Sequence, residues 1–271
     1  MQKPSISLIV STYNQPDFLR LVLHGVANQT DTDFELLIAD DGSTPETKSL
    51  IDEFKQKNSF AITHIWHDDN GFQKAQILNK AVLASKNDYV VFLDGDCVPR
   101  THHVRDHRRL ARKNRIVGCS RILLGETITK HAIGNQLQVH NWTPLKLLGF
   151  FISGHANRVA ALLRVPMGPL RTITPKNWKK VRGCNFSIHK SDFIQIGGFD
   201  ESFTGWGYED SDLVARAINS ECYVRRGDYL GTVFHLWHQE VNRNEAESNK
   251  SSLEETLNTG RKMARSSSIV G

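Results

Sequence analysis

The chain has no continuous stretch of about 20 apolar residues, the length that a membrane-spanning helix requires. Its N-terminus enters the apolar run 5–10 directly, without a basic segment followed by a long apolar one, so we expect no signal peptide. These two absences predict a soluble or peripheral protein that works on the cytoplasmic side.

Closely spaced cysteines are also missing. The four cysteines lie far apart without a CxxC pair, which argues against a zinc ribbon or a disulfide framework and favours reduced thiols. No internal repeat is visible. A Gly-rich basic phosphate loop near the N-terminus is absent too, which weighs against a nucleotidyltransferase.

The bulk composition allows a sizeable core. With 271 residues and 39% hydrophobic content, the chain fits one α/β domain or a domain with a short appendage. Its net charge of +5 suits an anionic partner, which could be a nucleotide diphosphate, an acidic glycan, a phospholipid surface or nucleic acid.

Apolar β-rich runs alternate with helical patterns through the first ~100 residues, which predicts right-handed βαβ units and a parallel sheet. We expect strands at 6–10, 34–39, 61–66 and 89–93, and helices at 18–26, 46–57 and 74–84. Polar clusters follow these strands, where ligands bind in such sheets, so we expect the clusters to converge.

The second half is less regular. We expect an irregular or helical cover over 121–180, a return strand at 186–188, helices at 190–197 and 209–218, a last strand at 229–236, and a flexible tail over 261–271. We divide the domain into a nucleotide-sugar-binding half, 1–120, and an acceptor-binding and catalytic-base half, 121–260.

Two acidic motifs close predicted strands. In Asp94-Gly95-Asp96, two carboxylates separated by a small residue can bind a hard divalent cation together with diphosphate oxygens, although a simple turn explains the motif equally well. Asp40-Asp41-Gly42-Ser43, taken alone, is better explained as a strand-ending turn.

Together with 7–14, these motifs resemble the nucleotide-binding half of a family-2 glycosyltransferase. The resemblance implies the GT-A fold, a Rossmann-like α/β arrangement with a mostly parallel central sheet flanked by helices and a C-terminal acceptor-binding subregion. It implies that Ser11 and Tyr13 border the uridine and that Asp41 accepts a hydrogen bond from the uracil ring. It also implies that Asp94 and Gly95 lie at the donor and that Asp96 ligates the metal.

The stretch 70–79 resembles the family's helix start, where a basic residue reaches the donor. Lys74 occupies this position. It supplies the positive charge of the arginine that many relatives carry, but not the forked set of guanidinium donors. Contact with the diphosphate is our prediction, and a solvated helix lysine is the alternative.

The string 197–212 is similar to the C-terminal galactosyltransferase-type segment of β-1,4-galactosyltransferases and bacterial chondroitin-type polymerases. An inverting transfer needs a carboxylate that takes the acceptor hydroxyl's proton, and a helix N-terminus keeps such a group ionised. By the resemblance Asp210 is the base and Glu209 holds substrate hydroxyls, with helix capping as the alternative. Trp206, between two glycines, is predicted to stack on a sugar, with core packing as the alternative. By the resemblance to galactosyltransferases, its loop is predicted to close over the donor.

Two histidines near the end of the last predicted strand suit a metal. His238, and less strongly His235, can join Asp96 on one ion. The stretch 235–245 resembles the metal-binding segment of the β-1,4-galactosyltransferases. Nitrogen ligands with carboxylate and diphosphate oxygens favour Mn²⁺, with Mg²⁺ as the alternative.

A basic, histidine-containing segment at 100–115 is predicted to form a helix. A solvated face, contact with a phosphorylated acceptor and contact with an anionic membrane are three alternatives for it.

The sequence therefore predicts a metal-dependent, inverting glycosyltransferase. We expect a UDP-sugar donor, and the C-terminal resemblance alone favours galactose or N-acetylgalactosamine over glucose or N-acetylglucosamine. The expected acceptor is a glycan or lipid-linked saccharide of bacterial lipopolysaccharide, capsule or another surface polysaccharide. A nucleic-acid-binding protein is the rival, but it leaves the acidic clusters without a role, and we expect no nucleic-acid partner.

Overall fold

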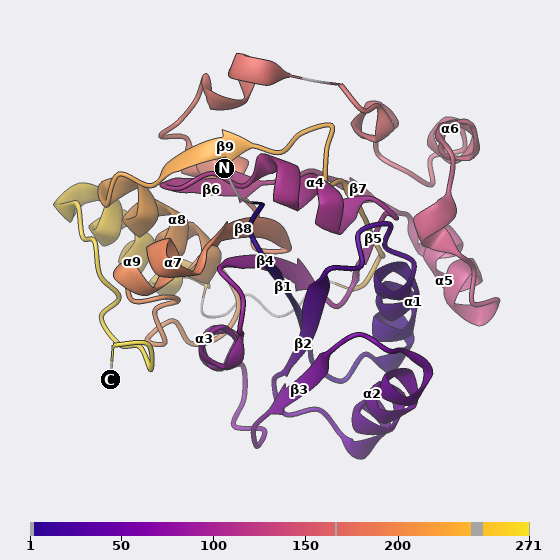
Figure 1. Cartoon of the computed structure of the whole chain (residues 1–271), viewed down its shortest axis with the longest axis horizontal. Helices are drawn as coiled ribbons and strands as arrows, with labels where there is room; N and C mark the ends of the chain where they lie inside the picture. Colours follow the sequence, from indigo (N-terminus) through magenta and orange to yellow (C-terminus); the bar gives the residue numbers. More distant parts are fainter. Residues whose placement is uncertain (1–2, 166, 240–245, 271) are drawn as a thin grey trace.

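The fold is built around one central sheet with helices on both faces (Figure 1). The computed structural model describes residues 3–165, 167–239 and 246–270. Within these residues, a seven-stranded sheet has the order β3-β2-β1-β4-β8-β6-β9 and a three-stranded sheet has the order β5-β10-β7.

The strands of the large sheet are β1 (Ile6–Thr12), β2 (Phe34–Asp40), β3 (Ile62–Trp66), β4 (Tyr89–Asp94), β6 (Arg115–Gly118), β8 (Asn185–His189) and β9 (Tyr223–Arg226). The small sheet contains β5 (Cys97–Pro99), β7 (Arg121–Leu123) and β10 (Val233–His235). The helices are α1 (Pro16–Ala27), α2 (Pro45–Lys57), α3 (Lys74–Ala84), α4 (His103–Leu110), α5 (Glu126–Gly134), α6 (Pro144–Ile152), α7 (Lys190–Gln195), α8 (Glu209–Asn219) and α9 (Ala246–Thr259). Short 3₁₀ turns, including η3 (Gly168–Thr172) and η4 (Trp178–Lys180), connect α6 to β8.

The predicted parallel sheet is confirmed for the first four long strands. β1 pairs in parallel with β2 and β4, and β2 pairs in parallel with β3. Every residue of β1 and β2 is buried, as expected for strands covered on both faces. β8 runs antiparallel between β4 and β6, so the sheet takes strands from both predicted halves of the domain.

Two hydrophobic clusters occupy the two faces of the sheet. One packs α1 and α2 against residues such as Leu8 and Leu36, and the other packs α3, α7 and α8 against residues such as Phe92. Phe92 stacks on Phe186 of the adjacent strand with ring centroids 4.6 Å apart. This core holds the strand ends in register, and the site residues lie at those ends.

The last predicted strand is shorter in the structure and lies in the small sheet. It begins at Val233, because Tyr229 (φ 63°) and Gly231 (φ 61°) adopt left-handed backbone conformations that an extended strand does not accommodate. The edge strand β9, which the sequence reading did not predict, pairs in parallel with β6.

The predicted flexible tail is docked against the body of the protein over residues 261–270. The Arg261 guanidinium pairs with Asp200 and Asp212 at 2.8 Å each. Ile269 packs against the cluster of α3, α7 and α8. Because Asp200 and Asp212 are fully buried, the tail arginine neutralises charge that would otherwise be costly to bury.

Two of the three histidines in the basic segment 100–115 are buried rather than exposed to solvent. His103 and His107 are buried and contact Asn185 at 3.1 and 3.2 Å. Burial lowers the pKa of both imidazoles, to about 4 for His103. His103 and His107 therefore fit none of the three alternatives, a solvated face, a phosphorylated acceptor or a membrane, because both side chains are buried in the core.

No described helix is both long enough and apolar enough to cross a bilayer.

Candidate active site

The predicted donor motifs meet at the carboxyl ends of β1, β2 and β4. Thr12 pairs with Asp40 and Ser11 pairs with Asp94 across the parallel register. The Ser11 hydroxyl donates a hydrogen bond to Asp94 Oδ1 at 2.9 Å, and Lys74 Nζ donates to the same oxygen at 2.7 Å. The Asp94 carboxylate thus joins its own segment to those of Ser11 and Lys74, which are far apart in sequence.

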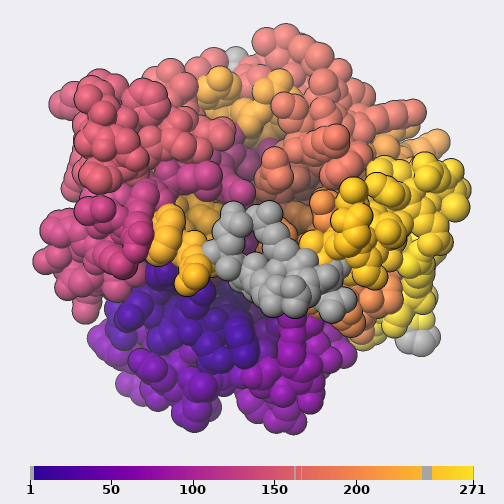
Figure 2. Space-filling view, turned by 180° about the vertical axis from the view of Figure 1, so that it is seen from behind, coloured from indigo at the N-terminus to yellow at the C-terminus, as the bar shows by residue number. Residues whose placement is uncertain are grey.

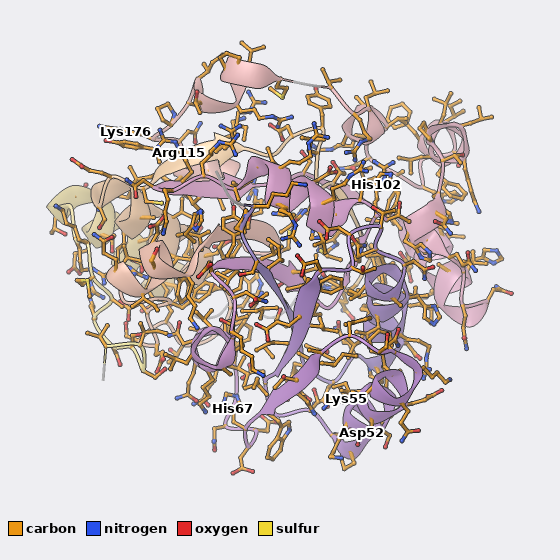
Figure 3. All side chains as sticks on the ribbon, in the orientation of Figure 1. Asp52, Lys55, His67, His102, Arg115 and Lys176 are labelled. Carbon is orange, nitrogen blue, oxygen red and sulfur yellow. The ribbon has the colours of Figure 1, made fainter. Side chains whose placement is uncertain are left out.

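Asp41 is held by neighbours that the sequence reading did not identify. His67 Nε2 contacts Asp41 Oδ1 at 2.7 Å, and the Gln73 amide donates to Asp41 Oδ2 at 3.0 Å. Burial raises the pKa of the Asp41 carboxyl. His67 follows β3 and is labelled in Figure 3. The polar residues that follow β3 could have identified His67 from the sequence, because the end of β3 lies at the same edge of the sheet as the other polar clusters.

Tyr13 lies beside this cluster at the surface. Its side chain is 47% exposed, and its hydroxyl donates to Asp69 Oδ2 at 2.9 Å. An exposed aromatic ring next to fixed carboxylates is suited to border a flat heterocycle.

Gly95 is required by a close backbone approach. A Cβ atom at this position would lie 2.6 Å from the Ser11 carbonyl oxygen, well inside van der Waals contact. Glycine therefore lets the chain turn tightly against β1 between Asp94 and Asp96. The carboxylates of Asp94 and Asp96 consequently belong to two different clusters of side chains.

Asp96 faces two histidines of the β10 segment. Its Oδ2 lies 3.1 Å from His238 Nε2 and 3.5 Å from His235 Nε2. The antiparallel register of β5 and β10 pairs His235 with Cys97, and ligand atoms of Asp96, Cys97 and His235 lie within 4.8 Å of one another. The predicted metal residues are therefore neighbours in space.

Strong electrostatic coupling marks this cluster. Burial alone would raise the pKa of Asp96, but the hydrogen bond with His238 and the charge of His235 lower it to about 2. The hydrogen bond to Asp96 raises the pKa of His238 to about 9, and burial lowers the pKa of His235.

The residues present fit a divalent cation. Asp96 Oδ1 is buried without a hydrogen-bond partner among the described residues, although an oxygen in that position ordinarily has one. His238 Nδ1 contacts the Gln239 carbonyl at 2.9 Å, which leaves Nε2 directed at Asp96, the arrangement typical of a ligating histidine. Residues 242–245, which belong to the resemblance to a metal-binding segment, lie outside the described residues.

Glu209 and Asp210 begin α8, and Lys74 links them to the donor cluster. The carboxylates of Asp94, Glu209 and Asp210 raise the pKa of Lys74 even though burial opposes its charge. Burial, together with the charge of Asp210, raises the pKa of Glu209 to about 7. Glu209 Oε2 is buried and has no partner among the described residues.

Asp210 is oriented by the backbone. The Gly183 amide donates to Asp210 Oδ2 at 2.6 Å, and the Ser211 amide donates to Asp210 Oδ1 at 2.6 Å. A Cβ atom on residue 183 would lie 2.9 Å from Asp210 Oδ2, so glycine permits this contact. Asp212, the third acid of the motif, pairs instead with buried Arg216 at 2.7 Å and is structural.

Trp206 lies in the loop before α8. It is 40% exposed and stands between Gly205 (φ 70°) and Gly207 (φ 112°). Both flanking conformations favour glycine and leave part of the indole uncovered.

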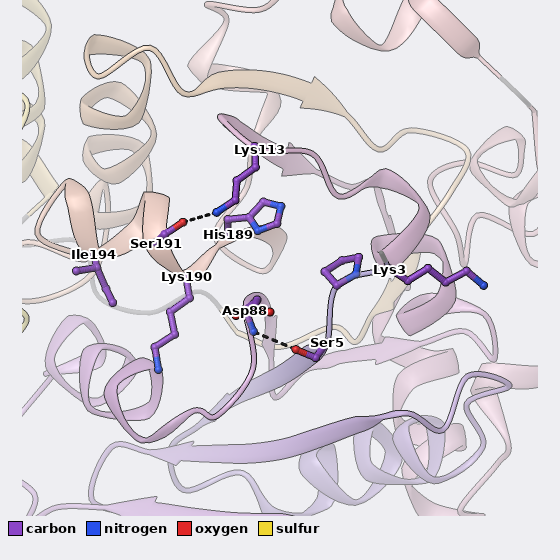
Figure 4. A pocket seen from close by; sticks show the side chains of 9 residues that line it. Lys3, Ser5, Asp88, Lys113, His189, Lys190, Ser191 and Ile194 are labelled. Atoms are coloured by element: carbon purple, nitrogen blue, oxygen red, sulfur yellow. Dashed lines mark hydrogen bonds between the residues drawn. The ribbon is translucent and has the colours of Figure 1, made fainter. Parts of the chain in front are cut away.

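Figure 2 shows the face on which the orange segment around 230–239 meets the indigo N-terminal segment. A separate hollow lies at the opposite, amino end of β1 and β4 (Figure 4). It is lined by residues that include Lys3, Asp88 and His189, and by none of the predicted site residues.

Comparison with known proteins identifies the family. Residues 7–155, more than half of the chain, match the profile of glycosyl transferase family 2. The chain belongs to glycosyltransferase family 2. Residues 172–239 of this glycosyltransferase match a second profile, described as the N-terminal domain of galactosyltransferase.

The glycosyltransferase is similar to several curated bacterial enzymes. It is 25% identical to chondroitin synthase of Escherichia coli, over 81% of this chain and 33% of that protein. It is 27% identical to validoxylamine A glucosyltransferase of Streptomyces hygroscopicus subsp. jinggangensis, over 78% of this chain and 50% of that protein. The hyaluronan synthase of Pasteurella multocida is 25% identical over 92% of this chain and 26% of its own length. The chain thus spans about a quarter to a half of these relatives.

Solved structures confirm the GT-A fold. A mannosyltransferase of Pyrobaculum calidifontis, solved with GDP-Man and Mn²⁺, matches with a TM-score of 0.59 and 17% identity, over 89% of this chain and 59% of that chain. TarS 1-349 of S. aureus matches with a TM-score of 0.60 and 14% identity, over 94% and 65% of the two chains. Family membership supports the predicted glycosyltransferase over the alternative of a nucleotidyltransferase.

Proposed function

We propose that this glycosyltransferase is metal-dependent and inverting, and that it moves a sugar from a UDP-sugar to a glycan acceptor in the synthesis of a bacterial surface polysaccharide. Galactose or N-acetylgalactosamine is favoured as the donor sugar. The observation that carries the proposal is the ion pair of Lys74 with Asp94 at 2.7 Å, to which the nearby charges of Glu209 and Asp210 add by raising the pKa of Lys74 as well. One pocket can then hold donor and acceptor together.

The donor base is proposed to lie between Tyr13 and Asp41. The His67 and Gln73 contacts fix the Asp41 carboxylate in one orientation, which suits it to accept a hydrogen bond from uracil. A TarS structure solved with UDP also supports a uridine nucleotide, whereas the mannosyltransferase was solved with GDP-Man. The choice of UDP is therefore part of the proposal and of its test.

Asp96, His238 and His235 are proposed to hold the metal. Mn²⁺ suits this mixture of nitrogen and oxygen ligands, and Mg²⁺ is the alternative. When bound, a divalent cation neutralises charge on the diphosphate of the leaving nucleotide. Lys74 adds a fixed positive charge on the side of Asp94.

Asp210 is proposed as the general base. The amides of Gly183 and Ser211 hold its carboxylate in place at the start of α8. It would take the proton of the acceptor hydroxyl as that oxygen attacks the anomeric carbon opposite the leaving group, which inverts the configuration. Glu209, whose buried Oε2 has no hydrogen-bond partner among the described residues, would accept a hydrogen bond from a sugar hydroxyl.

The half-exposed indole of Trp206 is proposed to stack on a sugar ring. The flanking glycines would let its loop close over the bound donor.

Ligand-induced thermal stabilisation tests the donor and the metal. UDP with Mn²⁺ should raise the melting temperature, GDP with Mn²⁺ should raise it less, and an oligonucleotide should leave it unchanged. Stabilisation by oligonucleotide but by no UDP-sugar would refute the proposal.

Substitution tests the base. Asp210→Asn should abolish sugar transfer and metal-dependent hydrolysis of UDP-sugars while UDP binding persists. Asp52→Asn, on the exposed face of α2, is the matched control and should behave as the parent protein. Near-normal turnover by Asp210→Asn would show that another group takes the proton.

A further inference from the structure

Helix α6 is apolar on its outer face as well as its inner one. Leu147 is buried in the core, and Phe150 packs against it from the same side. On the outer face, Leu145 and Ile152 are 78% and 76% exposed. Exposed Leu148 lies between them, and the spacing 145, 148, 152 forms one stripe along the helix.

Further exposed apolar side chains follow α6 along the chain. Residues 153–165 and 167–180 run along the upper edge of the molecule in Figure 1, and in Figure 2 the same pink-to-salmon segment borders the upper edge of the other face. Exposed apolar side chains recur along it at Leu163, Leu170 and Ile173. We call the exposed apolar side chains of 145–173 the apolar rim. A series of this kind along one edge marks an interaction surface.

The charge of this part of the chain has one sign. Residues 127–191 contain ten Lys or Arg and no Asp or Glu, whereas the rest of the chain contains 24 Lys or Arg and 29 Asp or Glu. Several of these cations are exposed beside the rim, including Lys146, Arg158, Lys176 and Lys179. Lys176 lies at the upper left edge in Figure 3.

Lys146 shows how cation and apolar surface combine. Its Nζ lies 5.1 Å from the Trp142 ring centroid and 5.9 Å from that of Phe150, so its stem lies along the aromatic surface of α6. Long basic side chains arranged in this way keep their charge at the level of lipid headgroups while apolar neighbours insert below it.

We propose that the apolar rim docks the enzyme onto an anionic phospholipid bilayer. Apolar side chains supply insertion, and the acid-free cationic segment supplies attraction to negative headgroups. A second copy of the chain fits less well, because pairing two copies of this rim would bring two cationic segments together.

The rim is continuous with the segment that supports the metal cluster. The Leu124 amide donates to the His235 carbonyl at 2.9 Å, and the Gly125 amide donates to the His155 carbonyl at 2.8 Å. His155 follows α6 directly. A docked rim therefore holds the His235 segment close to the lipid surface, where a lipid-linked acceptor would lie.

Co-sedimentation of the full chain with vesicles tests the proposal. Binding should be strong to vesicles containing phosphatidylglycerol, weak to phosphatidylcholine alone, and reduced by salt. The double substitution Leu145→Glu/Ile152→Glu should weaken partitioning by about tenfold or more, since it places two anionic groups against the headgroups. Both side chains are largely exposed, so the fold should be retained, which thermal unfolding checks.

Leu83→Glu is the matched control, because Leu83 is 48% exposed on α3, away from the rim. It should partition as the parent protein does. Light scattering without vesicles should report a monomer. The proposal is overturned by equal binding to both vesicle types, by no binding, by an unaffected double variant, or by a dimer that the double variant dissociates.

Discussion

Gly183→Ala is expected to impair catalysis through the position of Asp210 alone. The added Cβ would lie 2.9 Å from Asp210 Oδ2 and 3.2 Å from its Cγ. The carboxylate must therefore move by several tenths of an ångström, and the 2.6 Å hydrogen bond from the Gly183 amide lengthens or breaks. The aspartate itself remains, so the substitution tests the position of the carboxylate without removing it.

Displacing the base should lower the catalytic rate more than it lowers the stability of the fold. We expect kcat to fall by roughly 10- to 100-fold, since small misplacements of a catalytic group cost up to about two orders of magnitude. Removing the carboxylate in Asp210→Asn should cost about 10²- to 10⁴-fold. The overpacked contact should lower the free energy of unfolding by about 1–2 kcal/mol.

The assay pairs UDP release from a UDP-sugar in the presence of Mn²⁺ with calorimetric binding of UDP. Gly183→Ala should lower kcat and leave the Kd for UDP unchanged within about twofold, because a position effect is confined to the reacting end. Gly134→Ala is the control, as a Cβ there meets nothing within 4 Å. Parent-like turnover of Gly183→Ala alongside an inactive Asp210→Asn would refute the positioning role of this contact.

Further outcomes follow from the same geometry. Asp96→Asn and His238→Ala should each weaken Mn²⁺ binding by about 10-fold or more in calorimetry with UDP present, and unchanged affinity in both would move the metal elsewhere. Gly95→Ala should lower the free energy of unfolding by about 1–3 kcal/mol in urea, because its Cβ would lie 2.6 Å from the Ser11 carbonyl; parent-like unfolding would contradict the close approach. Glu209 has its pKa raised to about 7, so the folded state holds a proton that the unfolded state releases between about pH 4.5 and 7. Stability from this group is therefore lost as pH rises through that window. The free energy of unfolding of Glu209→Gln, compared with that of the parent protein, should consequently be roughly 3 kcal/mol more favourable near pH 8 than near pH 4. A difference between the two proteins that does not change with pH would count against the raised pKa.

Much of the fold was predictable because local pattern and global architecture agree. The predicted helix 74–84 coincides with α3, and the predicted strands 34–39 and 89–93 are extended by a single residue in β2 and β4. Buried parallel strands read as continuous apolar runs, and the polar residues that end them stand out. The convergence of these ends follows from parallel topology and needs no coordinates.

Other features had no local signal. The edge strand β9 is 4 residues long, and its partner β6 lies about a hundred residues earlier in the chain. The burial of His103 and His107 depends on Asn185 and Ser187 of β8, and basic neighbours in sequence concealed it. The docking of the tail depends on Asp200 and Asp212, which only the folded chain brings near Arg261.

The sequence by itself determined the alternating architecture, the residue types of the site and the identity of its acidic motifs. Strand ends and helix starts are local properties, and short-range sterics and apolar burial dictate them. The tertiary structure alone decided that His67 and Gln73 hold Asp41, that Gly183 holds Asp210, and that Lys74 pairs with Asp94. These contacts join segments far apart in sequence. Their distances follow from how both faces of the sheet are packed, which no local pattern encodes.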